Sequence, residues 1–270
     1  MIVLPDKWKQ EWQNKDLFET VLSLQGEEFR NMDGRRTLRF EMLGKSYFAK
    51  IYSGIGWSRI IKSLLSLRKP PVLSASNEWK AIRKLEELGV STMTLVGYGE
   101  QGRSPALRQS FIITEDLVQT ESLEDFCRDW RVHPPNTRLK RALIKKLAQI
   151  SRQLHENGIN HRDYYLCHFL LDISEGRESL DPERLNLYLI DLHRVQFRRQ
   201  LPQRWLIKDL ASLYFSAMEI GLTRRDCLRF MRAYSDKALQ GIINDEKSLW
   251  LKVETRAQCL LRRYYRKYAP

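Results

Sequence analysis

The chain has 270 residues, of which 43% are hydrophobic and 29% are charged. This balance is typical of a folded globular protein and excludes wholesale disorder. The 46 Lys and Arg residues exceed the 33 Asp and Glu residues and give a formal net charge of +13. Such an excess favours anionic partners, namely nucleic acid, a phospholipid surface, a phosphorylated glycolipid or an acidic protein, but it does not choose among them.

Three further features of the chain predict a cytoplasmic protein. The apolar runs, such as Leu185–Leu192, are too short to span a membrane. The N-terminal segment reaches charged residues too early to form the apolar centre of a secretion signal. The four cysteines have no paired spacing, so neither a zinc site nor a disulfide framework is indicated, and reduced, buried thiols are expected.

The first hundred residues predict a β-rich region that is interrupted by one or two helices. Thr37–Met42 and Ser46–Tyr52 contain strand-forming residues on either side of a turn at Gly44, as in two strands of a meander. Ser76–Leu88 predicts a helix, because it begins with a capping serine, carries apolar residues at helical spacing and is followed by a glycine. Two more strands are predicted over Thr94–Gly99 and Ser110–Thr114.

After Leu117 the pattern becomes mainly helical. Ser122–Trp130 and Arg138–Glu156 predict helices, and the chain from Leu206 to its end also has helical character. Two short apolar runs between them, His168–Ile173 and Leu185–Leu192, predict strands. The order is thus β-rich and then α-rich, which indicates two lobes joined by a short hinge.

The strongest chemical signal is the segment His161-Arg162-Asp163-Tyr-Tyr-Leu-Cys-His168, which lies between a long predicted helix and a predicted strand. This is the setting of the protein-kinase catalytic loop, in which His-Arg-Asp is followed five residues after the Asp by Asn. In phosphoryl transfer one carboxylate orients the acceptor hydroxyl and accepts its proton, and the protein otherwise supplies positioning and charge stabilisation. We therefore predict Asp163, with Arg162 and His161, as the catalytic residues.

Residues on either side of this loop supply the remaining parts of a kinase site. The predicted strand before Asp191 ends in that carboxylate, the hard oxygen ligand that Mg²⁺ prefers. Lys50 ends a strand segment similar to the kinase Val-Ala-Ile-Lys run, and it is expected to hold the α- and β-phosphates of ATP. Glu78 on the following helix is placed to pair with Lys50. The hinge residues Glu115 and Leu117 are expected to bind adenine.

Each of these residues also has a purely structural interpretation. Lys50 can protect an edge strand, Glu78 can interact with a helix dipole and Asp191 can cap a turn. What favours the functional interpretation is the order, because all the parts occur in kinase sequence, each in its expected setting.

We therefore predict an α+β, two-lobed protein-kinase-like fold. Its β-rich N-terminal lobe would cover residues 1–117, with a hinge at 114–120, and its mostly helical C-terminal lobe would cover residues 118–270. The residues Lys50, Asp163 and Asp191 are expected to meet around one nucleotide in the cleft between the lobes.

Lys50, the catalytic-loop residues and Asp191 belong to longer motifs, and the motifs of the chain are Arg35–Glu41, Gly44–Lys50, Ile159–Leu171 and Leu189–Arg194. On these motifs the sequence resembles the heptose (I) kinases of lipopolysaccharide, the family called WaaP or RfaP, over nearly the whole chain. The resemblance implies an enzyme of a Gram-negative bacterium that uses ATP and Mg²⁺ to phosphorylate the first heptose of the lipopolysaccharide inner core, at the cytoplasmic face of the inner membrane. It also implies Asp163 as the catalytic residue, and Lys50 and Asp191 as the phosphate and metal anchors.

The sequence departs from ordinary protein kinases in several places. His168 stands where those enzymes carry a metal-binding Asn, and since imidazole is a poor Mg²⁺ ligand, both ligation and packing stay open for it. No Ala-Pro-Glu follows Asp191, so a phosphorylation-controlled activation loop is not expected. The glycine-rich loop that covers the ATP phosphates in protein kinases is also missing. Arg35 or Arg36 at a hairpin tip is expected to bind the phosphates in its place, and the alternative is that both side chains are solvated. Asp209 either braces the catalytic loop or is a helix N-terminal acid.

Two basic segments fit work at a membrane. Arg59–Lys69 is basic and amphipathic, and Arg262–Tyr268 mixes cations with tyrosines that favour the lipid–water boundary. Solvated helix faces are the alternative interpretation. A basic surface would attract and hold the anionic glycolipid that the resemblance implies as substrate. The resemblance also implies a small acidic protein, an acyl carrier protein, as a partner.

Other functions stay open at this point. Within kinases, the acceptor is alternatively the neighbouring core sugar 3-deoxy-D-manno-octulosonic acid, a small molecule or a protein tyrosine. A basic nucleic-acid-binding module, with Arg262–Tyr268 as its contact, would leave Lys50, Asp163 and Asp191 unexplained, so no nucleic-acid partner is expected. A catalytically inactive scaffold is the last alternative.

Overall fold

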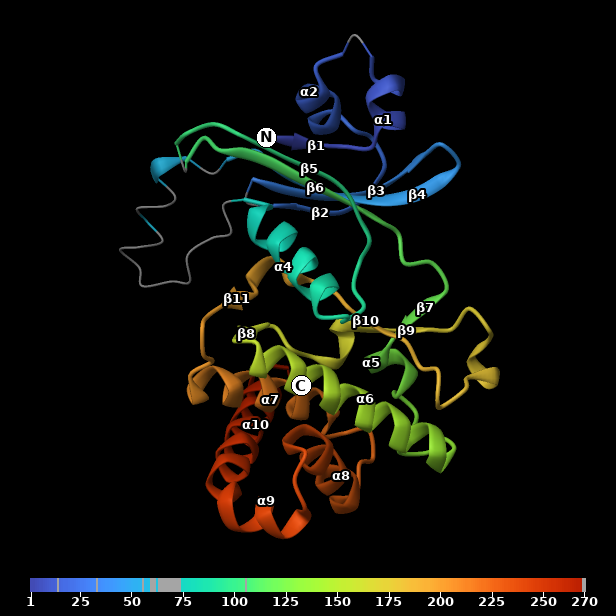
Figure 1. The fold of residues 1–270 in the computed structure, drawn as a ribbon, viewed down its shortest axis with the longest axis vertical. Helices are drawn as coiled ribbons and strands as arrows, with labels where there is room; N and C mark the ends of the chain where they lie inside the picture. The colour runs from blue at the N-terminus through green and yellow to red at the C-terminus, as the bar shows by residue number, and fades with distance from the viewer. Residues whose placement is uncertain are drawn as a thin grey trace. The chain divides into compact units, whose positions relative to one another are not determined.

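The computed structural model describes residues 1–13, 15–32, 34–54, 56–58, 62, 74–104 and 106–268. The chain divides into two compact units (Figure 1). Unit 1 contains Met1–Glu87 and Thr92–Val118, and unit 2 contains Leu88–Ser91 and Gln119–Pro270. The basic segment Arg59–Lys69 lies outside the described residues, apart from Lys62.

A six-stranded antiparallel sheet forms the centre of unit 1, with the strand order β1-β5-β6-β4-β3-β2. The predicted strands are confirmed, and β3 and β4 are joined by a two-residue turn in which Leu43 and Gly44 both have positive φ, as the twist of a hairpin favours. The strands are β1 (Ile2–Val3), β2 (Glu27–Met32), β3 (Arg35–Met42), β4 (Lys45–Tyr52), β5 (Leu95–Gln101) and β6 (Gln109–Glu115).

The two faces of this sheet are covered by different helices (Figure 1). α1 (Asp6–Glu11) and α2 (Leu17–Leu22) lie on one face, where Trp8 and Phe18 pack in a buried cluster with Tyr47, Ala49 and Ile51 of β4. α4 (Ser76–Glu87), the predicted helix, lies on the other face. Because side chains alternate along a strand, Lys50 points to the face that carries α4.

Unit 2 is mainly helical and carries two small antiparallel sheets, with the orders β10-β9-β7 and β11-β8. The predicted helix over Ser122–Trp130 is wrong in length, since α5 covers Leu123–Phe126 and a series of turns follows it. The strands are β7 (Thr120–Ser122), β8 (Ile159–Asn160), β9 (Phe169–Asp172), β10 (Leu187–Leu189) and β11 (Gln196–Phe197). The other helices are α6 (Thr137–Glu156), α7 (Gln203–Ala217), α8 (Arg224–Ser235), α9 (Leu239–Asp245) and α10 (Lys247–Tyr268), and short 3₁₀ helices are η1 (Leu166–His168), η2 (Arg177–Ser179) and η3 (Leu192–Arg194).

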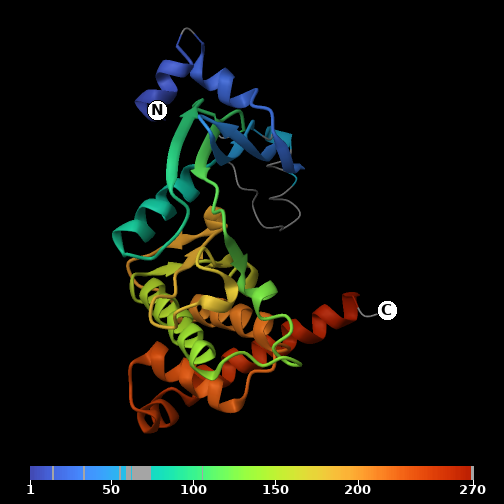
Figure 2. The same ribbon diagram turned by 90° about the vertical axis from the view of Figure 1, so that its right-hand side faces the viewer.

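The core of unit 2 is an apolar cluster shared by α6, α7, α8, α9 and α10, with Leu210, Tyr234 and Trp250 among its buried members. The last turns of α10 project beyond the other helices of this unit (Figure 2), and the basic segment Arg262–Tyr268 on them is exposed. Within the described part of the chain, none of the helices has both the length and the apolar composition of a membrane span. All four cysteines are unpaired, but the expectation that they are buried is wrong for three of them, since Cys127 alone is buried.

The chain enters the catalytic-loop region through Gly158, which follows the last residues of α6 with a φ of +71°. A Cβ atom at this position would lie 1.8 Å from the carbonyl oxygen of Arg198, so the backbone approach requires glycine. Gly89 follows α4 in the same way, with a φ of +68°, but a Cβ there would meet nothing within 4 Å.

We expect Gly158→Ala to destabilise the protein more than Gly89→Ala. Both substitutions place alanine in the left-handed region, which costs roughly 1–2 kcal/mol. Gly158→Ala also forces the β8–β11 pair apart and should cost about 1–3 kcal/mol more. Urea unfolding followed by circular dichroism measures the difference, and equal midpoints for the two variants would show that the close approach at Gly158 is not a constraint.

Candidate active site

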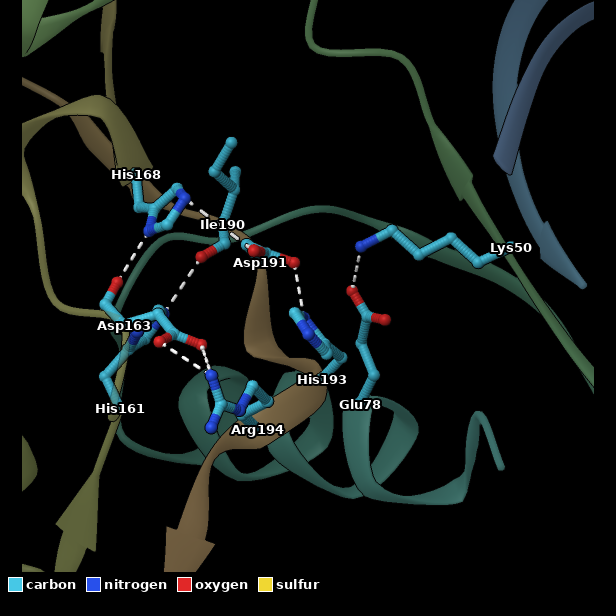
Figure 3. Close-up of polar contacts among 9 residues, drawn as sticks. All are labelled: Lys50, Glu78, His161, Asp163, His168, Ile190, Asp191, His193 and Arg194. Carbon is cyan, nitrogen blue, oxygen red and sulfur yellow. Dashed lines mark hydrogen bonds and ion pairs between the residues drawn. The ribbon is translucent and has the colours of Figure 1, made fainter. Parts of the chain in front are cut away.

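In unit 1 the predicted phosphate anchor is an ion pair between β4 and α4. The Nζ atom of Lys50 lies 2.5 Å from Oε1 of Glu78, so the predicted pairing is confirmed (Figure 3). The Glu78 side chain is 1% exposed and that of Lys50 is 15% exposed. A carboxylate so deeply buried requires a cationic partner, and the pair therefore fixes the ammonium group of Lys50 at one place on the sheet.

The predicted hinge residues lie at the end of β6. The N–H of Glu115 donates to the carbonyl of Thr94 at 3.0 Å, and its carboxylate is 3.8 Å from Lys45 Nζ. Leu117 is half-buried, just before the boundary of the unit. Adenine binding by Glu115 and Leu117 stays a prediction.

Arg35 and Arg36 are engaged within unit 1 rather than solvated. The Nε atom of Arg36 lies 2.5 Å from Oε1 of Glu28, and its Nη2 donates to the carbonyl of Leu24 at 2.6 Å. The guanidinium of Arg35 lies over the ring of Tyr52, 5.7 Å from its centroid. Arg36 therefore fastens the segment before β2 to the sheet, which gives it a structural role.

In unit 2 the catalytic loop is held by Asp209. Its Oδ2 accepts from the N–H of His161 at 2.6 Å, and its Oδ1 accepts from the N–H of Arg162 at 3.0 Å. Asp209 is 1% exposed and lies well inside α7, which begins at Gln203. The interpretation as a helix N-terminal acid is therefore wrong, and the bracing role is confirmed. Arg162 itself has a φ of +76°, a strained conformation that this brace maintains.

The carboxylate of Asp163 is bound by a residue that the sequence analysis missed. Arg194 Nη1 lies 3.0 Å from both Oδ1 and Oδ2 of Asp163 (Figure 3). The two side chains are 21% and 19% exposed, respectively, so the pair is shielded but reachable. Arg194 ends the motif Asp-Leu-His-Arg, three residues after Asp191. A cation at this spacing from the predicted metal ligand was the sequence signal that could have identified it.

Asp191 follows β10 and adopts a left-handed conformation, with φ 60° and ψ 48°. Such a turn is costly for a residue other than glycine and indicates that the surrounding contacts impose it. One contact is His193, also missed from the sequence, whose Nδ1 lies 2.5 Å from Asp191 Oδ1. On the other side, Asp191 Oδ2 lies 3.7 Å from Nε2 of His168.

His168 has a defined tautomer. Its Nδ1 lies 2.6 Å from the backbone carbonyl oxygen of Asp163, and since a carbonyl can only accept, Nδ1 carries the hydrogen. In the neutral ring Nε2 therefore presents a lone pair to the Asp191 carboxylate. Two lone pairs that face each other need a proton or a metal ion between them, so His168 and Asp191 fit a shared cation.

No complete metal site is formed by the described residues, since no three His, Cys, Asp or Glu side chains converge as ligands. Mg²⁺ in kinases is held by one or two protein ligands together with phosphate oxygens and water. The pair of Asp191 and His168 is compatible with this arrangement.

His161 has a positioning role. It is completely buried, and its Nε2 donates to the carbonyl of Ile190, the residue before Asp191, at 3.0 Å. Burial lowers the pKa of His161, which keeps the ring neutral near pH 7. The residue thus ties the catalytic loop to the Asp191 turn, and unit 2 brings together all five of its predicted residues, which are His161, Arg162, Asp163, His168 and Asp191.

Residues 19–234 match the lipopolysaccharide kinase (Kdo/WaaP) family model. The chain belongs to this family. It is 51% identical over 265 residues to the lipopolysaccharide core heptose(I) kinase WaaP of Pseudomonas aeruginosa, a match that covers 98% of this chain and 97% of the relative. It is 49% identical over 268 residues to the protein of the same name from Escherichia coli strain K12, with 99% of both chains covered.

Among solved structures, a WaaP in complex with acyl carrier protein matches this chain with a TM-score of 0.82 and 46% identity. The match covers 96% of this chain and 99% of that one. The predicted α+β protein-kinase-like fold, with a β-rich N-terminal region and a helical C-terminal region, is therefore confirmed.

For a kinase of this family, we expect Arg194→Gln to lower kcat by about 10–100-fold, because a carboxylate that loses its partner is no longer held in position. The KM for ATP should change little. A single nitrogen of Arg194 makes both contacts, so Arg194→Lys should retain more activity than Arg194→Gln. Steady-state kinetics measure both values, and Arg184→Gln, at an exposed position, is the control. An unchanged kcat in Arg194→Gln would contradict the role.

Proposed function

We propose that this protein is an ATP-dependent kinase that phosphorylates heptose I of the lipopolysaccharide inner core. The observation that carries the proposal is the pair of carboxylates on one braced scaffold, Asp163 on the catalytic loop and Asp191 on the adjoining turn, in a chain about half identical to heptose(I) kinases. Asp209 and His161 hold this scaffold from inside unit 2. A carboxylate placed in advance needs no reorganisation when the hydroxyl arrives.

In the proposed reaction Asp163 accepts a hydrogen bond from the acceptor hydroxyl and takes its proton as the oxygen attacks the γ-phosphorus of ATP. Arg194 keeps both oxygens of Asp163 in place until the hydroxyl competes for one of them. Lys50 holds the α- and β-phosphates, and Asp191 with His168 would hold Mg²⁺. When bound, the metal ion supplies charge neutralisation for the transferring phosphoryl group.

An acyl carrier protein is the proposed protein partner, because the similar WaaP was solved in complex with one. Unit 2 contains a cavity of about 710 Å³ whose lining is mostly apolar and includes Leu143, Leu213, Phe230 and Trp250. A cavity of this size and chemistry fits an acyl chain. The net charge of +13 favours approach of an acidic carrier, as it favours the anionic glycolipid and the inner-membrane surface, where we place the protein as a peripheral enzyme.

Asp163→Asn should lower kcat for transfer to a heptose-containing core oligosaccharide by about 10²–10⁴-fold, because the amide cannot accept the proton. ATP binding should persist, since Asn preserves the shape of the side chain. Mass spectrometry of the product locates the phosphate, and Asp129→Asn, an exposed change of the same type, is the control. Phosphate found on another core sugar, or transfer that survives in Asp163→Asn, would reject the assignment.

His168→Ala separates the two roles left open for this residue. If Nε2 binds the metal, the Mg²⁺ concentration for half-maximal activity should rise by about 10–100-fold, as for the loss of a ligand or its support. His168→Asn, which offers an oxygen ligand, should recover most of this loss. His133→Ala, at an exposed histidine, is the control. A lower melting temperature with an unchanged Mg²⁺ requirement would mean that His168 only packs against its neighbours.

A further inference from the structure

An aromatic side chain lies beside Lys50 on the same face of the unit 1 sheet. Side chains alternate along a strand, so Phe48, two residues before Lys50 in β4, points to the same face as Lys50. Tyr47, Ala49 and Ile51 point to the opposite face, where they belong to the buried cluster with α1 and α2. The half-buried ring of Phe48 thus lies on the side of the sheet away from that cluster, beside the predicted phosphate anchor.

A second aromatic side chain, that of Phe29 in β2, reaches Phe48. The two ring centroids lie 5.2 Å apart, with an angle of 60° between the ring planes. The register of β2 and β3 shifts between Glu28 and Arg30, which makes Phe29 the bulged residue, and a bulge redirects its side chain. Phe29 extends across β3 to Phe48 and is still 56% exposed. We call Phe29 and Phe48 the aromatic pair, and its exposed surface is available to a flat ligand.

The aromatic pair lies at the end of β4 that adjoins the hinge. Phe48 is the strand partner of Thr114, which directly precedes the predicted adenine-binding residue Glu115. Lys50 follows two residues further along β4, about 7 Å from Phe48. A purine has an edge with hydrogen-bonding groups, which suits the hinge backbone, and a flat face, which stacks on aromatic side chains. Both surfaces of a purine therefore have a partner at this end of the strand.

The other end of β4 adjoins a cation that suits phosphate. In the register of β3 and β4, Thr37 lies opposite Lys50 and Arg35 lies opposite Tyr52, so these β3 side chains share the face of Lys50. Arg35 and Lys50 are diagonal neighbours, with their Cβ atoms roughly 7–8 Å apart. The guanidinium of Arg35 lies over the ring of Tyr52, and its Nε is buried without a hydrogen-bond partner among the described residues. A buried cationic donor of this kind favours an anionic acceptor.

We propose that ATP lies along β4 with its adenine ring on the aromatic pair and its phosphate chain between Lys50 and Arg35. The inference rests on the proposed function, which takes ATP as the phosphoryl donor. It states how the nucleotide is oriented and which side chains take the place of a glycine-rich loop. The order of the groups along the strand, which is aromatic ring, lysine and arginine, matches the order of base and phosphates in the nucleotide.

Calorimetric titration with ATP and with tripolyphosphate, both with Mg²⁺ and without acceptor, tests the adenine contact. Phe48→Leu keeps an apolar side chain but removes the ring, and it should weaken ATP binding by about 10–100-fold, because a base–aromatic stack is lost. The conservative variant Phe48→Tyr keeps the ring and should retain most of the affinity. Neither change should alter the affinity for tripolyphosphate, which has no base. The comparison of the two variants on ATP is decisive even where tripolyphosphate binds too weakly to measure.

Equal ATP affinities in Phe48→Leu and Phe48→Tyr, or an equal loss for ATP and tripolyphosphate in Phe48→Leu, would overturn the proposal. Phe29→Leu keeps the test decisive if Phe48→Leu does not fold, because Phe29 is exposed and its replacement leaves the core intact. This variant should weaken ATP binding by about 5-fold, since part of the stacking surface is lost. An unchanged ATP affinity in Phe29→Leu would then contradict the aromatic pair as the adenine site.

Arg35→Gln tests the phosphate contact. It should weaken the binding of ATP and of tripolyphosphate alike, by about 10-fold, because hydrogen bonds from a cation to phosphate are lost. Arg103→Gln removes the same charge at an exposed position of unit 1 and should bind both ligands like the wild type. An equal loss in both variants would mean that the charge acts only at long range, and together with an unchanged affinity in Arg35→Gln it is the outcome that overturns the role of Arg35.

Steady-state kinetics with a core oligosaccharide separate ATP from the other ligand that stacks on aromatic rings, the acceptor sugar. In Phe48→Leu the KM for ATP should rise, whereas the KM for the oligosaccharide should not change. A raised KM for the oligosaccharide with unchanged ATP affinity would show that the aromatic pair binds the sugar and would overturn the inference. If the titrations give the expected results but no phosphate reaches heptose in the wild type, the proposed function alone is rejected.

Discussion

The carboxylate of Asp209 is the constraint on which the geometry of unit 2 depends. It accepts two backbone N–H groups from the catalytic loop and thereby holds Arg162 in a conformation that is unfavourable for a residue other than glycine. Its burial makes the arrangement stiff, because a charge with 1% exposure has no alternative partner in water. The direction of the Asp163 carboxylate and that of the Arg162 side chain follow from this one brace.

The turn after β10 carries the residues that contact the catalytic loop. Within four residues it provides the proposed metal ligand Asp191, the histidine that contacts it and the arginine that binds Asp163. His161 joins the two segments through the carbonyl of Ile190. A displacement of either segment would therefore move both carboxylates together, because the Arg194–Asp163 ion pair and the His161–Ile190 hydrogen bond link the loop to the turn.

The sequence was sufficient to predict the elements of the site that lie in fixed motifs. Lys50, Glu78, Asp163 and Asp191 were predicted from their order and from the type of element in which each lies, and the pairing of Lys50 with Glu78 was predicted from the place of Glu78 on the helix that follows the Lys50 strand. Arg194 and His193 were missed because the contact of Arg194 joins segments that are distant in the chain, and that of His193 arises from a turn whose dihedral angles composition does not reveal. The helix predicted over Ser122–Trp130 is shorter in the structure, because turns follow α5 after Phe126.

The net positive charge of the chain and the cations beside the catalytic loop act over different ranges. A net charge of +13 spread over a surface gives long-range attraction that salt screens within about 10 Å. The cations around the indole of Trp205 differ from this, because α7 and the braced catalytic loop fix their positions. In many protein kinases charge near this loop answers a phosphorylated activation segment, whereas this chain lacks the Ala-Pro-Glu that bounds such a segment. In this chain the arginine of the His-Arg-Asp motif lies over the ring of Trp205 instead.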